Sequence, residues 1–200
     1  RVLDNYVIMP ITINGSGTIT GLSVGGLPDG CVDTDTIASS VALGISEADQ
    51  WRYTTITAGN QDPISGNLER NDTDFDKIGT GMSESSGVFT FPSTGIWWVK
   101  ADAVFQLDGQ SSQYDIIQIL CTTDNSNYNV RGDSMTSDGY GGVAQSVYLN
   151  ASTSTIFDVT STTNCKVKFK VILQTTNNNK LVGSTSKNMT TFTFIRLGAT

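Results

Sequence analysis

The chain has 200 residues, a formal net charge of −7, 38% hydrophobic and 16% charged side chains, which describes an acidic globular protein of one or two domains. It contains no histidine, so it lacks the commonest general base, the usual partner of a serine or cysteine nucleophile and the usual zinc ligand. Its 12 lysine and arginine residues are too few for the clustered basic surface that nucleic acids or anionic membranes attract. No apolar stretch approaches the roughly 20 residues of a membrane span. We therefore expect no nucleic-acid partner, no membrane insertion and no cofactor.

Residues 1–46 predict an extended, glycine-rich arm. Val7–Ile13 is an apolar stretch that favours extended structure, and Asn14–Gly17 after it favours a turn. The apolar residues that follow are spread among glycines too openly to enclose a core, so we expect the arm to find its partners on another surface. Asp33–Leu43 predicts a short helical turn. Because the chain begins at Arg1 with no cleavage pattern after it, we expect a processed product or a fragment of a longer protein.

The cysteine content is low and odd. Cys31, Cys121 and Cys165 cannot form a disulfide framework, and one bridge at most would leave a free thiol. We therefore expect stability to come from a packed core or from oligomerisation.

From Trp51 onward the sequence is a succession of short alternating runs. In Cys165–Val171 four apolar residues share one face and three lysines the other, as a half-buried strand requires. Further strand candidates are Tyr114–Leu120, Val143–Leu149, Ile156–Val159 and Phe192–Leu197. Thr122–Asn129 and Thr175–Asn179 are too polar to bury. About eight strands separated by turn residues predict an all-β antiparallel sandwich or jelly roll.

A more specific pattern runs from Phe75–Ile78 to Gly87–Val99. A strand ends at Pro92, a short turn follows through Gly95, and an aromatic pair begins the next strand. This order of residues resembles the signature of the complement C1q and tumour necrosis factor jelly-roll superfamily, and Thr191–Leu197 is similar to that family's last strand. The resemblance covers about Glu47–Thr200 and implies a trimeric jelly-roll head over residues 47–200. An unrelated β-sandwich with a coincidental proline-glycine turn is the alternative.

The arm carries a second resemblance. Gly17–Gly30, leading to Asp35–Ala38, is similar in style to the glycine-rich segments that precede head domains in tail-fibre and other structural proteins of tailed phages. Together with a jelly-roll head, this implies a virion appendage that is located on the virion surface or outside the cell. The arm would then contact other virion subunits.

Two short motifs could bind a partner or a metal. Arg131–Ser134 is the integrin-recognition tetrapeptide, expected on an exposed loop within Thr122–Gly142, although glycine-aspartate is also ordinary turn chemistry. Asp72, Asp74 and Asp76 alternate as in a calcium loop. The glycine and the final glutamate of an EF-hand are missing, with Ser83 in the glutamate position, so a solvated acidic loop is the expectation.

Carbohydrate could be attached to the chain, or be bound by it, at other positions. Formal glycosylation acceptors begin at Asn14, Asn71, Asn150 and Asn188. The tryptophans Trp51, Trp97 and Trp98 could form a sugar-stacking platform, but tryptophan in such a sheet is more often core or subunit interface. Consecutive Trp97 and Trp98 in a strand face opposite sides, so one can join the core while the other meets a neighbouring subunit.

Catalysis is not expected. Asp102, Asp108 and Asp115 could in principle supply a glycosidase pair, but nothing in the sequence groups them. The glutamates are Glu47, Glu69 and Glu84, and they form no motif either.

The first functional hypothesis is a virion structural or appendage protein, such as a fibre, head fibre or knob. It would bind a host-surface receptor or glycan as a trimer, gaining avidity from three sites. The alternative is a self-assembling extracellular filament or matrix subunit, in which Val7–Ile13 completes a neighbour's sheet by strand addition. A secreted cytokine-like ligand is disfavoured by the lack of a signal segment and of a disulfide plan. The sequence assigns no receptor-binding residue.

Overall fold

The computed structural model describes residues 12–13, 19–20, 44–71, 75–109, 111–139 and 146–200. The chain divides into two compact units, Arg1–Leu43 and Gly44–Thr200. In the first unit, β1 (Thr12–Ile13) and β2 (Ile19–Thr20) pair in antiparallel fashion. The predicted helical turn at Asp33–Leu43 lies outside the described residues. Among those residues there is no helix of the length and apolar character that crosses a bilayer.

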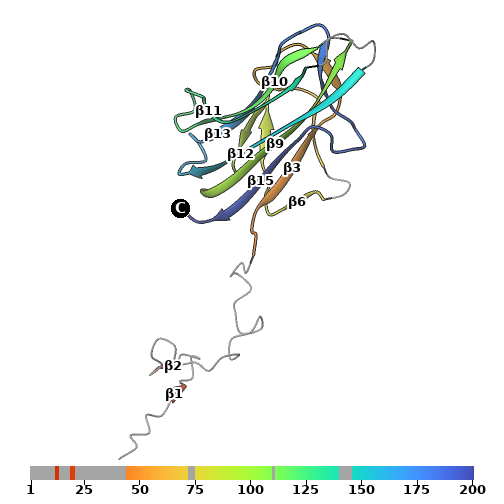
Figure 1. Ribbon diagram of the computed structural model, residues 1–200. Helices are drawn as coiled ribbons and strands as arrows, with labels where there is room; N and C mark the ends of the chain where they lie inside the picture. Colours follow the sequence, from red (N-terminus) through yellow and green to blue (C-terminus); the bar gives the residue numbers. More distant parts are fainter. Residues whose placement is uncertain (1–11, 14–18, 21–43, 72–74, 110, 140–145) are drawn as a thin grey trace, which may run out of the picture. The chain divides into compact units, whose positions relative to one another are not determined.

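The second unit is a sandwich of two antiparallel sheets (Figure 1). Its strands are β3 (Ala48–Tyr53), β4 (Ile56–Ala58), β5 (Leu68–Arg70), β6 (Lys77–Ile78), β7 (Ser83–Ser85), β8 (Val88–Thr90), β9 (Gly95–Asp108), β10 (Ser112–Thr122), β11 (Asn129–Asp138), β12 (Ser146–Val159), β13 (Lys166–Leu173), β14 (Asn179–Val182) and β15 (Thr191–Gly198). One sheet, called here the β9 sheet, has the order β4-β14-β9-β15-β3-β5, with β12 on the other side of β9 and β6 beside β3. The other, the β13 sheet, has the order β11-β10-β13-β8-β7.

β9 organises its sheet. Its residues alternate strictly, with odd-numbered side chains buried and even-numbered ones partly exposed, as a strand with one face on the core requires. β12 pairs with it along all 14 residues on one side, and β15 and then β14 pair with it on the other. Where β15 gives way to β14, the Thr190 hydroxyl donates to the Val182 carbonyl at 2.7 Å and accepts from the Val104 amide at 3.1 Å. The change of neighbour therefore leaves these backbone groups bonded.

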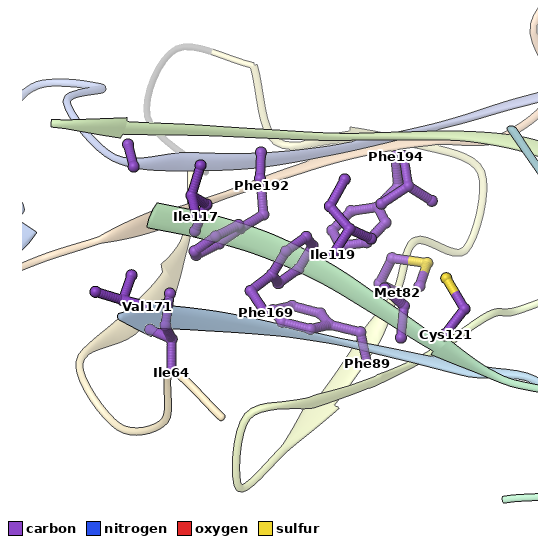
Figure 2. Close-up of a cluster of buried hydrophobic side chains, with 14 of the residues drawn as sticks. Ile64, Met82, Phe89, Ile117, Ile119, Cys121, Phe169, Val171, Phe192 and Phe194 are labelled. Carbon is purple, nitrogen blue, oxygen red and sulfur yellow. The ribbon is translucent and has the colours of Figure 1, made fainter. Parts of the chain in front are cut away.

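Aromatic rings fill the space between the sheets (Figure 2). Phe169 of β13 stacks on Phe192 of β15 with ring centroids 4.1 Å apart. Phe89 of β8 meets Phe169 edge-on at 5.6 Å and lies 5.1 Å from Phe194. Such ring pairs add to the free energy of burial, by about 0.5–1.5 kcal/mol each. They connect the two sheets directly, so the sandwich has one continuous core.

Most predicted strands are confirmed, but three boundaries were wrong. Val143–Leu149 and Ile156–Val159 were expected as separate strands, whereas β12 runs unbroken from Ser146, because the serines and threonines between them pair with β9. Residues 143–145 lie outside the described residues. The segment Thr122–Gly142 is not one long loop, since β11 within it pairs with β10. An edge strand tolerates such a polar sequence because it is open to water.

The third correction concerns Thr175–Asn179, which was expected to be too polar to bury. Asn179 begins β14 and is fully buried. Its amide Nδ2 donates to both carboxylate oxygens of Asp115, at 2.8 and 3.0 Å, and to the Ser112 hydroxyl at 3.0 Å. The Gln174 amide also donates to Asp115. These hydrogen bonds join β10 to β14 and offset the cost of removing the Asn179 amide nitrogen from water.

Asp115 makes stability depend on pH. Burial raises the pKa of its carboxyl, although the bonds from Asn179, Ser112 and Gln174 act in the opposite direction. The folded chain therefore holds this proton more tightly than the unfolded chain, and the group's contribution to stability is lost as the pH rises through the folded pKa. We expect the free energy of unfolding of Asp115→Asn, relative to wild type, to increase between pH 4 and pH 7. Urea unfolding at a fixed protein concentration measures this difference.

Asp124→Asn is the matched control of opposite sign. Hydrogen bonds from Asn127, Thr122 and Ser126 lower the pKa of the exposed Asp124 carboxyl, so its stabilisation is present at neutral pH and is lost on acidification. The deficit of Asp124→Asn relative to wild type should shrink as the pH falls from 7 to 3. Parallel pH profiles for the two variants would contradict at least one of the two assignments.

Candidate functional site

The outward face of the β9 sheet carries an unusual row of apolar side chains. The residues in register are Ile156 on β12, Trp98 on β9, Ile195 on β15, Ala48 on β3 and Ile78 on β6. Directly opposed residues of antiparallel strands project to the same face. Ile156 is 65% exposed and Ile78 41% exposed, Trp98 and Ile195 are partly exposed, and Ala48 is already buried at 6%. We call these five residues the apolar row.

A polar level follows along β9. Lys100 is opposite Ser154 and Thr193, and Asp102 is opposite Ser152 and Thr191. Lys100 Nζ lies 2.8 Å from Asp102 Oδ1. Farther along the strand, Val104 is in register with Val182, which is 2% exposed, and with the exposed Asn150 of β12. The apolar row is thus followed by a polar level at which the two charges of β9, Lys100 and Asp102, are paired.

β12 forms an edge next to this face. Among the described strands it pairs with β9 alone (Figure 1). Its 14 residues include one charged side chain, Asp158. Edge strands of soluble proteins are usually protected by charges, prolines or bulges, because their free amide and carbonyl groups can pair with another chain. A long edge with a single charge is typical of a strand that a partner covers.

The Arg131–Ser134 tetrapeptide lies in strand β11, so the prediction of a loop was wrong, although Arg131 and Asp133 are exposed as expected. Gly132 is buried, and a Cβ there would lie 2.7 Å from Thr153 Oγ1 of β12. The close approach of β11 and β12 therefore favours glycine here, because any larger residue would displace the Thr153 side chain. Between Gly132 and Val130 the register with β10 shifts, which leaves Arg131 as the extra residue of a bulge. Strand packing accounts for this glycine without an adhesion partner.

The tryptophans occupy three different environments. Trp97 is buried in the core and its Nε1 donates to the Ser93 carbonyl, while Trp98 projects outward into the apolar row, so their predicted opposite orientation is confirmed. Trp51 packs edge-on against Phe89, with Arg70 over its ring. The three indoles therefore do not form a sugar platform. The contact of Trp98 with a neighbouring subunit remains a prediction.

The carboxylates considered for catalysis are not brought together. Asp102 and Asp108 are both on β9, six residues and so about 20 Å apart, and Asp115 faces the interior from the other sheet. Asp108 pairs with Lys180, and that bond lowers the pKa of its carboxyl. Within the described ranges, no three histidine, cysteine, aspartate or glutamate side chains gather as metal ligands would.

The three glutamates hold the backbone or pair with a cation. Glu47 accepts hydrogen bonds from the Thr80 and Gly81 amides. Glu84 accepts from the Gly87 amide, and Glu69 pairs with Arg52. Each of these side chains thus has a structural role.

The residues of the predicted acidic loop and the glycosylation acceptors fall into three groups: outside the described residues, exposed, or buried. Asp72, Asp74 and Asn14 lie outside the described residues, and Asp76 is exposed. Asn71 is 2% exposed and bonds Gln50 through Nδ2, so it cannot carry a glycan in the folded chain. Asn150 and Asn188 are exposed.

The arrangement of the two sheets defines the class of fold: it is an antiparallel jelly roll of the tumour necrosis factor type. No family model matches the chain, and no curated protein matches it in sequence. The crystal structure of murine APRIL at pH 8.5 is similar, with a TM-score of 0.52, 12% identity and coverage of 76% of this chain and 98% of that one. Eiger TNF from S. frugiperda gives a TM-score of 0.58, 9% identity and coverage of 78% and 96%. The predicted C1q/TNF-like jelly roll is therefore confirmed as a fold.

The cysteines of the head are expected to be unreactive. Cys121 and Cys165 are free thiols, 1% and 0% exposed, and burial raises the pKa of Cys121 to about 12. In a Cys31→Ser chain, a disulfide reagent such as DTNB should modify neither thiol until urea is added, because the thiolate is the reacting species. Absorbance and peptide mass spectrometry measure the labelling. Rapid labelling of either cysteine in the native chain would contradict the packing.

Proposed function

We propose that this chain is a non-enzymatic recognition protein whose jelly-roll head forms a homotrimer and binds a cell-surface receptor or glycan at the tip of a virion appendage. The observation that carries the proposal is the apolar row continuing onto β12, an edge strand with one charged side chain. Burying this surface between copies removes apolar area from water and gives the edge a partner.

Charge favours a second copy as the occupant of this surface. The chain carries a net charge of −7, so most approaches of one copy to another are repulsive at low salt. On the β9 sheet the outward charges are largely balanced, with Lys100 paired to Asp102 and Arg52 to Glu69. Copies can therefore meet here with little electrostatic cost.

The geometry also suits a closed ring. A cyclic trimer needs two different surfaces on each chain, because its contacts are head-to-tail. The face with the apolar row and the edge formed by β12 are adjacent and different. The likeness to tumour necrosis factor folds supports a trimer, since the superfamily resemblance implies one.

The proposed virion location and receptor binding are supported by observations other than the apolar row. The resemblance of Gly17–Gly30 to segments that precede phage fibre heads supports an appendage. A rigid trimer presents three copies of any binding site, which converts weak single contacts into strong surface attachment.

Ile156→Lys tests the assembly surface, with Met135→Lys as a matched control. The two side chains are equally exposed in a single chain, at 65% and 63%, but Met135 lies on β11 of the other sheet. Light scattering of the full chain at several concentrations should give three copies for wild type and Met135→Lys, and one copy for Ile156→Lys, because lysine would bury a charge in the contact. Circular dichroism should show all three folded.

A monomeric wild type, or a trimer that survives Ile156→Lys, would overturn the assembly surface. Mass that grows without limit as concentration rises, and only when residues 1–46 are present, would instead support the filament alternative.

Surface attachment can be tested with the same pair. Labelled wild-type protein and Met135→Lys should bind a host-cell or glycan surface, and the monomeric Ile156→Lys chain should bind at least about 100-fold more weakly because avidity is lost. Equal binding by monomer and trimer would contradict multivalent recognition. Flow cytometry or a glycan array supplies the measurement.

A further inference from the structure

We propose that the Lys100–Asp102 ion pair determines which chains can join the assembly, an inference that rests on the trimer proposed above. The two side chains occupy successive outward positions of β9, and Lys100 Nζ is 2.8 Å from Asp102 Oδ1. Each side chain is 34% exposed in the single chain. The pair thus lies within the face that the proposed contact covers and is still open to water before assembly.

The immediate cross-strand neighbours of the pair are uncharged, and Arg52, which is in register beyond Thr191, is paired with Glu69. The cross-strand neighbours of Lys100 are Ser154 and Thr193, and those of Asp102 are Ser152 and Thr191. The apolar row lies on one side of this level, and Val104 lies on the other. Each charge therefore depends on the other for compensation once water is excluded.

Assembly changes what the pair contributes. In the single chain an exposed ion pair is worth about 0–1 kcal/mol, because water solvates both groups. In a covered contact, desolvation roughly cancels the attraction within an intact pair, whereas a charge left without its partner is strongly unfavourable. The pair consequently adds little affinity between matched chains but penalises any contact in which one charge is unbalanced.

The penalty for an unbalanced charge favours contacts between identical copies of the chain. Every wild-type chain brings a neutral unit to the contact, so three copies add no net charge to it. A related jelly-roll chain with an unmatched carboxylate or ammonium at the same level would bury an uncompensated charge against it. The pair thereby provides specificity through exclusion of wrong partners.

The test uses full-length variants that break or reverse the pair. Asp102→Asn and Lys100→Gln each leave one charge alone, and the double variant Lys100→Asp/Asp102→Lys keeps a reversed pair. Lys187→Gln removes an exposed lysine elsewhere and matches Lys100→Gln in net charge. Light scattering over a dilution series gives the concentration at which the trimers dissociate, and circular dichroism checks that each variant is folded.

We expect both single variants to dissociate at a concentration at least about 10-fold higher than wild type, while the reversed pair and Lys187→Gln stay within about threefold. Single variants that match wild type would overturn the inference and leave the trimer intact. A reversed pair as weak as the single variants would also overturn it, because a neutral unit must work in either orientation. A wild-type monomer would instead refute the trimer, and Ile156→Lys would then have no effect on mass.

Discussion

The stacking of Phe169 on Phe192 connects the two sheets, and the properties of the outer surface depend on it. A strand has only two faces, so directing Phe192 and Phe194 into the core forces Thr193 and Ile195 outward. The same rule applies to β9, where burial of Trp97 and Val99 fixes the outward direction of Trp98 and Lys100. The apolar row and the ion pair are therefore consequences of core packing, and a slip of one residue in either strand would erase both.

The parts of the fold that were predicted correctly are those where burial imposes an alternating pattern. Lys166–Leu173 and Thr191–Gly198 alternate because one face packs against the rings of the other sheet. β11 has no such pattern, since it is an edge strand whose residues are mostly polar, and Asn179 looks like a loop residue until Asp115 is placed beside it. Local sequence does not encode these tertiary partners.

The candidate surface was predictable only in part. One of Trp97 and Trp98 was expected in the core and the other at a subunit contact, and the strand places Trp98 outward. Ile156 and Ile195 are far from it in sequence, and only the strand register aligns them with Trp98. An apolar residue at an outward position of a strand, as Ile156 is among serines and threonines, is the one local signal that could have indicated the row. The register of five strands cannot be read from the sequence alone.

The presence of a single charge on β12 has a consequence for a chain that has not yet met a partner. A newly made chain displays a 14-residue edge that offers hydrogen bonds to any extended segment. In the proposed trimer, closure of the ring would require successive encounters between copies, so dilution would slow it and leave more time for pairing with unrelated nascent chains. Synthesis of several copies near one another on a shared message, or held together by their arms, would shorten the interval during which this edge is open.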